Sequence, residues 1–285
     1  MKRVGLYNIE PKIHNTALMK ISQYHKDNGD HVEWYVDFER DLYDKIYCSS
    51  LFDFTDKSQV PENAICGGTG FDINQKLPPE IDECDLDYSI YPGCRTSYIW
   101  FSRGCFRNCP FCIVREKEGY IHPVKPSNLN PKGKSIKIMD NNFFGHKDWK
   151  KAGEYLDKWD LPIIFSSGID LRIFEKDQAE FINKYVKLIN HNVIHCAWDD
   201  PDYDMIPKIK EIVKYIKPYK LMCYVLIGFD STVDQDLMRV EKLEEYDISP
   251  FVMPYNKSNT YQKRFARWVN NKAIFKSVKW EDYKG

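Results

Sequence analysis

The chain has 285 residues, which is enough for one large domain or for one medium domain with a small additional unit. Hydrophobic residues make up 43% and charged residues 29% of the sequence, which is ordinary for a soluble globular protein. The formal net charge is −1, and proteins that grip phosphate backbones usually carry a basic excess. Charge therefore does not favour a nucleic-acid partner, although a local basic patch is compatible with it.

The lack of a recognisable signal segment and the number of cysteines both bear on the compartment in which the protein works. The opening segment MKRVGLYNIE has no apolar signal region, and no apolar run is long enough to span a membrane. The nine cysteines then point to a reducing compartment, where thiols serve metals or chemistry more often than disulfides. We expect a cytoplasmic protein with no membrane partner.

The order of strand-like and helix-like segments in residues 1–75 predicts a small, reduced Rossmann-like α/β unit. Its predicted elements are strands at 3–8, 31–36 and 45–49, a helix at 14–28, and a strand entering a glycine-rich turn at 64–70. Residues 76–95 contain three prolines and a run of acids, which is typical of a linker.

Residues 96–285 show a regular alternation of strands and helices. Predicted strands lie at 97–102, 135–140, 163–170, 193–198, 221–229 and 250–255, and predicted helices at 147–158, 176–190, 203–216, 232–245 and 260–271. This alternation is typical of βαβ units around a parallel sheet. Six strands are fewer than the eight of a closed barrel, so we expect a partial (β/α)6 TIM-like barrel followed by a C-terminal helix.

One cysteine motif stands out on the loop after the first of these strands. Cys105, Cys109 and Cys112 have the spacing Cys-x3-Cys-x2-Cys. Three thiolates on one short loop can ligate three irons of a [4Fe–4S] cluster and leave the fourth iron open. The alternatives are three inert core cysteines or a zinc site. Polar and turn-forming neighbours argue against the core, and zinc prefers paired Cys-x2-Cys units or a histidine partner.

This motif, with the aromatic Phe111 before its last cysteine, resembles the signature of the radical S-adenosylmethionine superfamily. The pattern of residues 97–255 is similar to the partial (β/α)6 barrel of that superfamily. The resemblance implies that S-adenosylmethionine binds the open iron through its amino and carboxylate groups. One electron then cleaves the sulfonium, and a 5′-deoxyadenosyl radical abstracts hydrogen from a substrate. It also implies an external electron donor of the flavodoxin or ferredoxin type.

Further cofactor contacts are expected at the carboxyl ends of the barrel strands. The superfamily's glycine-rich segment is replaced by Asp140 and Asn141, followed by Asn and Phe, which resembles the Asp-Asn-Phe form of cobalamin-linked members. The resemblance implies that these two residues contact the cofactor's amino group, Arg172 its carboxylate, Asp199 its ribose, and Ile227 its adenine. Phe111 is a further expected contact.

Each of these polar residues also has a structural interpretation. Asp140 and Asn141 could simply end a strand, and Arg172 could pair with Asp170 or Glu175. Asp199 could cap the next helix.

The N-terminal unit resembles the cobalamin-binding domain of related enzymes, with Gly67 and Gly68 in the position of its Gly-Gly turn. The lower-ligand signature Asp-x-His-x-x-Gly is absent and the unit is half-sized, so bound cobalamin is not expected. Four further cysteines raise the alternative of a second cluster, although their irregular spacing favours structural thiols: Cys48, Cys66, Cys84 and Cys94.

The resulting hypothesis is a radical enzyme, and its layout resembles short members from phage and anaerobe genomes. The substrate stays open between a nucleic acid or nucleobase and a peptide or metabolite, and no residue is assigned to it. The alternatives from other classes are a non-catalytic electron-transfer or cluster-carrier protein and a barrel that only binds.

Overall fold

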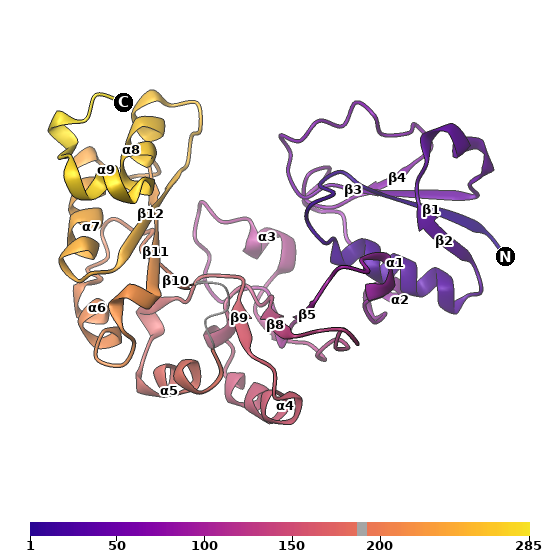
Figure 1. The fold of residues 1–285 in the computed structure, drawn as a ribbon, viewed down its shortest axis with the longest axis horizontal. Coiled ribbons are helices and arrows are strands. Elements are labelled where there is room, and N and C mark those ends of the chain that lie inside the picture. The colour runs from indigo at the N-terminus through magenta and orange to yellow at the C-terminus, as the bar shows by residue number, and fades with distance from the viewer. Residues whose placement is uncertain (187–192) are drawn as a thin grey trace. The chain divides into compact units, whose positions relative to one another are not determined.

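The computed structural model describes residues 1–186 and 193–285, and it shows a mixed α/β protein built on sheets of parallel strands. The expected α/β class is therefore confirmed. The chain divides into two compact units (Figure 1). The first comprises Met1–Trp100, Cys112–Gly119 and Lys125–Ile136, and the second Phe101–Phe111, Tyr120–Val124 and Lys137–Gly285.

A four-stranded sheet forms the centre of the first unit. Its strands are β1 (Arg3–Asn8), β2 (His31–Trp34), β3 (Lys45–Ser49) and β4 (Ile65–Gly67), in the order β2-β1-β3-β4. Every neighbouring pair is parallel. All four predicted strands of this region are present, and β1 lies between β2 and β3.

Helix α1 (Thr16–Asp27) crosses between β1 and β2. It starts because the Asn15 side chain accepts hydrogen bonds from two backbone N–H groups of the first turn. It ends before Gly29, whose φ of 76° reverses the chain. The buried side chains of the helix include Leu18 and Ile21, which pack with Val4 and Leu6 of β1.

The segment 76–95, which its composition suggests is a linker, contributes to the core of the first unit. It contains helix α2 (Pro79–Asp82) and a 3₁₀ turn at Tyr88–Ile90. Its buried side chains belong to two hydrophobic clusters together with residues of α1 and β1: Ile81, Leu86, Tyr88, Tyr91 and Cys94. The first unit also contains β5 (Thr96–Ile99) and α3 (Val114–Glu118).

The second unit contains the later predicted strands in chain order. Strand β8 (Ser135–Ile138) begins in the first unit and ends in the second, where β9 (Ile163–Phe165) follows. Next come β10 (Ile194–Ala197), β11 (Leu221–Ile227) and β12 (Ser249–Pro254), which form a parallel sheet in this order. A parallel bridge between Ile169 and Cys196 joins the chain after β9 to β10.

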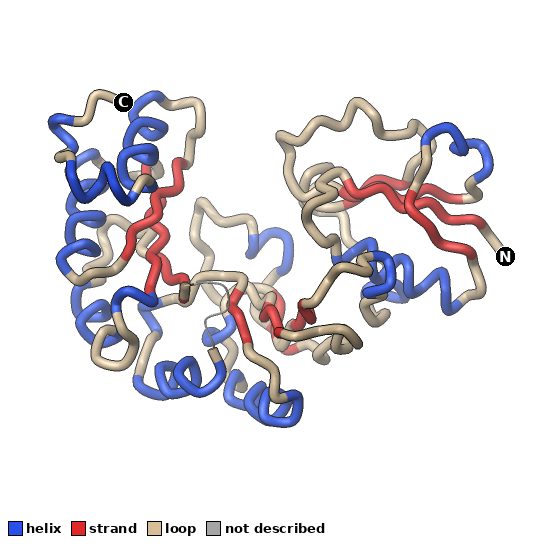
Figure 2. The backbone as a smooth tube through the Cα atoms, in the orientation of Figure 1, coloured by secondary structure: helices blue, strands red, loops and turns tan. Residues whose placement is uncertain are grey.

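Helices separate these strands as the sequence predicts. They are α4 (Ala152–Trp159), α5 (Lys176–Tyr185), α6 (Ile206–Ile212), α7 (Val233–Glu245), α8 (Thr260–Asn270) and α9 (Lys272–Ser277). The last four residues of the helix predicted at 176–190 lie outside the described residues. Helices α7 and α8 pack against β11 and β12 (Figure 2). A short antiparallel pair, β6 (Ser102–Arg103) with β7 (His122–Pro123), is an addition that the sequence does not predict.

The outer edge of β12 is covered by a side chain. Asn270, the last residue of α8, accepts a hydrogen bond from Val252 N–H (2.8 Å) and donates one to the Val252 carbonyl (3.0 Å). Pro250 and Pro254, two positions before and after Val252, have no N–H group. The Asn270 amide thus replaces a neighbouring strand at this edge.

Among the described residues, none of the helices combines the length and apolar character needed to cross a bilayer.

Candidate functional site on the cysteine loop

The segment after β8 holds the chain where it enters the cysteine loop. Asp140 is buried, and its carboxylate accepts hydrogen bonds from Phe101 N–H (2.9 Å), Ser102 N–H (2.6 Å) and the Ser102 hydroxyl (2.6 Å). Burial raises the pKa of Asp140 to about 6, against the lowering effect of these donors. The Asp140 carboxylate therefore fixes the loop entrance.

The two residues after Asp140 reach the cysteine loop itself. Asn141 Oδ1 accepts a hydrogen bond from Gly104 N–H (3.0 Å), and Gly104 has a φ of 80°, a conformation that favours glycine. Asn142 Nδ2 lies 3.7 Å from Cys105 Sγ, and Arg107 N–H lies 3.4 Å from the same sulfur. Two N–H groups thus point at Cys105 Sγ, which suits an anionic sulfur.

Asp170 connects this loop to the chain after β9. Its carboxylate accepts hydrogen bonds from Arg172 Nε (2.8 Å), from Arg107 Nε and from Asn142 Nδ2 (3.5 Å). Burial alone would raise the pKa of Asp170, but the hydrogen bonds from Arg172 and Arg107 outweigh it and lower that pKa. Cys109 is a further neighbour of Arg172, and it raises the pKa of the Arg172 guanidinium. A guanidinium group held by Asp170 therefore lies beside the second cysteine of the motif.

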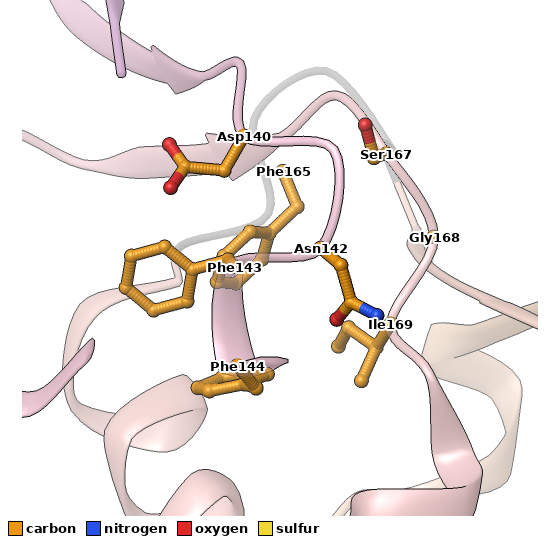
Figure 3. A pocket seen from close by; sticks show the side chains of 8 residues that line it. All are labelled: Asp140, Asn142, Phe143, Phe144, Phe165, Ser167, Gly168 and Ile169. Atoms are coloured by element: carbon orange, nitrogen blue, oxygen red, sulfur yellow. The ribbon is translucent and has the colours of Figure 1, made fainter. Parts of the chain in front are cut away.

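A small hollow lies next to these residues. Phe143 and Phe144 line one side and the backbone from Ser167 to Ile169 lines the other, with the Asn142 amide pointing toward Ile169 (Figure 3). The remaining lining residues are Asp140 and Phe165.

Asp199 follows β10 in the second unit. It accepts a hydrogen bond from Leu226 N–H of β11 (3.1 Å), and burial raises its pKa to about 6. The end of β10 is in turn held by Arg239 of α7, which donates to the Trp198 carbonyl (2.9 Å). Arg239 forms a completely buried ion pair with Asp236 (2.6 Å). Asp199 does not cap the next helix, which begins at Ile206.

Two predicted contacts are apolar. Ile227, at the end of β11, is completely buried. Phe111 meets Phe229 edge to face at 5.5 Å between ring centroids, and Phe229 meets Tyr255 in the same way at 4.9 Å. These three rings bring the cysteine loop to the carboxyl ends of β11 and β12.

The motif's third cysteine lies at a unit boundary, because the division between the two compact units falls between Phe111 and Cys112. Among the described residues, no three or more histidine, cysteine, aspartate or glutamate side chains are arranged to hold a metal ion. The donor chemistry nevertheless fits a cluster. N–H groups at Cys105 and a guanidinium at Cys109 are the kinds of groups that stabilise thiolates and tune cluster sulfurs.

The four N-terminal cysteines divide into a pair and two separate thiols. Cys48 and Cys66 face each other on β3 and β4. Cys84 and Cys94 each donate a hydrogen bond to a backbone carbonyl of their own segment.

Three residues of this site were not singled out from the sequence for the roles they have here. Asn142 and Arg107 reach Cys105 and Asp170, and Asp170 itself organises Arg172. Their sequence positions could have indicated these roles, since Arg107 lies within the motif and Asp170 precedes Arg172 by two residues.

No protein-family model matches the sequence, and a comparison with curated proteins finds no match either.

Proposed function

We propose that this chain is a radical S-adenosylmethionine enzyme that holds a [4Fe–4S] cluster on Cys105, Cys109 and Cys112. The observation that carries the proposal is the motif together with its surroundings. Three thiols lie within eight residues, the first receives two N–H groups, and the second lies beside Arg172. When bound, the cluster supplies the electron that cleaves S-adenosylmethionine to a 5′-deoxyadenosyl radical, which abstracts hydrogen from the substrate.

The proposed architecture is a partial (β/α)6 barrel preceded by a reduced Rossmann-like unit. The barrel proposal is supported by six strands that occur in chain order with intervening helices, and by the parallel bridge between Ile169 and Cys196. The N-terminal proposal is supported by the parallel sheet order β2-β1-β3-β4. We do not propose bound cobalamin.

Arg172 is the proposed ligand of the cofactor's carboxylate. Its guanidinium presents a planar fork of donors, and its bond to Asp170 fixes the orientation of that fork. Asp140 and Asn141 are proposed for the amino group, and both also hold the loop entrance. Asp199 is proposed to accept from the ribose hydroxyls.

The reaction requires a one-electron donor, which we propose to be of the flavodoxin or ferredoxin type, in the cytoplasm. The substrate class is left between a nucleobase or nucleic acid and a peptide or small metabolite, because no described residue discriminates between them.

The proposal is tested by anaerobic reconstitution with iron and sulfide, followed by reduction in the presence of S-adenosylmethionine. We expect iron and sulfide to bind in the ratio of a [4Fe–4S] cluster and 5′-deoxyadenosine to accumulate. Cys109→Ala should abolish both, whereas Cys84→Ala, a thiol in the first unit, should leave both intact. A stable cluster that never cleaves the cofactor would instead identify an electron-transfer or cluster-carrier protein.

A further inference from the structure

Two pairs of cysteines occupy directly opposed positions on neighbouring parallel strands. Cys48 of β3 faces Cys66 of β4, and Cys196 of β10 faces Cys223 of β11. Neighbouring strands lie about 4.8 Å apart, within the range of about 4.4–6.8 Å between the Cα atoms of a disulfide. Because opposed residues project from the same face of a sheet, each pair brings two sulfurs together.

The two pairs differ in exposure. Cys196 and Cys223 are both completely buried. In the first pair Cys48 is 2% exposed, but Cys66 is only half-buried on β4, which is an edge strand. Cys66 is therefore the more accessible of the two cysteines, and Cys48 lies directly opposite it.

The two thiols of the first pair are neighbours, and each affects the pKa of the other. The Cys66 thiol donates a hydrogen bond to the Ala64 carbonyl (3.6 Å). Burial raises the pKa of both thiols, that of Cys48 to about 12, and the neighbouring Cys48 offsets part of the rise at Cys66. Glu10 and Lys57 are the charged groups near Cys48. The greater exposure of Cys66 makes it the first sulfur to react.

We propose that Cys48 and Cys66 form a reversible thiol–disulfide pair that is oxidised by low-molecular-weight disulfides. The inference is independent of the proposed catalytic function, because it uses none of the residues of the cysteine loop.

The exchange proceeds in two balanced steps. Cys66, as the thiolate, attacks one sulfur of the small disulfide, whose S–S bond breaks and releases one small thiolate. Cys48 then loses its proton to solvent and attacks Cys66 Sγ, which expels the second small thiolate. The two protein thiols have lost two electrons and two protons, and the small disulfide has been reduced to two thiols.

The test treats the full chain, purified under anaerobic conditions without reconstitution, with oxidised glutathione. Remaining thiols are alkylated, and the digested protein is mapped by mass spectrometry. We expect a cross-link between the peptides of Cys48 and Cys66 that dithiothreitol reverses. Cys196 and Cys223 are the internal control, since they have the same geometry and should be alkylated only after denaturation.

Single variants separate the two roles. Cys48→Ser should accumulate a stable mixed disulfide of glutathione on Cys66, because the resolving thiol is gone. Cys66→Ser should leave Cys48 reduced. The proposal is overturned if Cys48 and Cys66 both stay reduced in the wild type while the protein remains folded. It is equally overturned if Cys66 pairs with another cysteine.

Discussion

Asp199 is a carboxylate whose ionised form is costly in the folded chain. Burial raises its pKa from 3.8 to about 6. Between these two values the folded state keeps a proton that the unfolded state has lost, so the free energy of unfolding falls as pH rises through this window. Above the window the folded state bears the whole cost of the buried charge, about 3 kcal/mol.

Asp199→Asn should remove this pH dependence. An asparagine keeps an oxygen that can accept from Leu226 N–H but does not titrate. We expect the stability lost between about pH 4 and pH 7 to shrink by about 3 kcal/mol, as measured by urea unfolding at a series of pH values. Asp200→Asn, an exposed neighbour, is the matched control. Parallel pH profiles of Asp199→Asn and wild type would contradict the prediction.

Asp170→Asn should destabilise the second unit by about 2–4 kcal/mol. The substitution leaves the guanidinium groups of Arg172 and Arg107 without their buried carboxylate. Urea unfolding measures the loss, and Asp177→Asn is the control. Asp177 pairs with Lys150 on the surface, where an ion pair contributes about 1 kcal/mol or less. Equal effects of the two variants would show that Asp170 does not organise the site.

The sequence predicts which residues carry thiols and charges near the site, but not how they pair. Cys105 and Cys109 are identifiable because their spacing is local. Asn142 lies 37 residues after Cys105, to which its amide donates, and Arg172 is still more distant in sequence from its neighbour Cys109, so no local pattern encodes these contacts. The pair with Asp170 that a structural interpretation predicts for Arg172 is present.

At the scale of elements, the turn after β11 depends on a glycine. Gly228 has a φ of 77°, and a Cβ atom there would lie 1.9 Å from Gln262 Nε2 of α8. Gln262 cannot move freely, because its Oε1 accepts a hydrogen bond from Asn256 N–H (2.8 Å). The close contact between this turn and α8 therefore requires the absence of a side chain.

Gly228→Ala should therefore lower the free energy of unfolding by about 3 kcal/mol. This is the cost of placing an alanine in the left-handed conformation plus the cost of displacing Gln262. Gly29→Ala is the control, since Gly29 has almost the same φ of 76° but nothing within 4 Å of its Cβ position. It should cost only about 1–2 kcal/mol. Thermal and denaturant unfolding measure both, and equal losses would mean that Gln262 adapts without cost.

Strands such as β1 and β11 are well predicted because they are rich in apolar residues, whereas the boundaries of strands depend on contacts. The strand predicted at 163–170 is shorter in the structure, because β9 ends at Phe165 and the residues from Ser167 line the hollow. Segment 76–95 is buried at irregular intervals, so neither helical nor strand periodicity reveals its role in the core. The helix predicted at 260–271 ends at Asn270, and Asn271 then caps a second helix, α9, which the sequence does not predict.

At the scale of the whole molecule, each compact unit has its own buried side chains. Leu6 belongs to the core of the first unit, and Leu243 is completely buried in the second. Truncating either leucine to alanine should cost about 3 kcal/mol. Because local unfolding follows cooperative units, we expect Leu6→Ala to lower amide protection in β1 and β3, and Leu243→Ala to lower it in β11 and β12.

Native-state hydrogen exchange followed by mass spectrometry resolves the two responses. Loss of protection that spreads evenly over both units in either variant would show that they unfold as one.

The amide of Asn270 on β12 has a consequence for how the protein meets other proteins. An edge strand normally exposes N–H and C=O groups that a strand of another chain can pair with, which is a route to aggregation. On β12 the N–H of Val252 is already bonded, and the two flanking alternate positions are prolines, which have no donor. An incoming strand would find none of these three positions able to donate, so this side of the sheet resists β-augmentation.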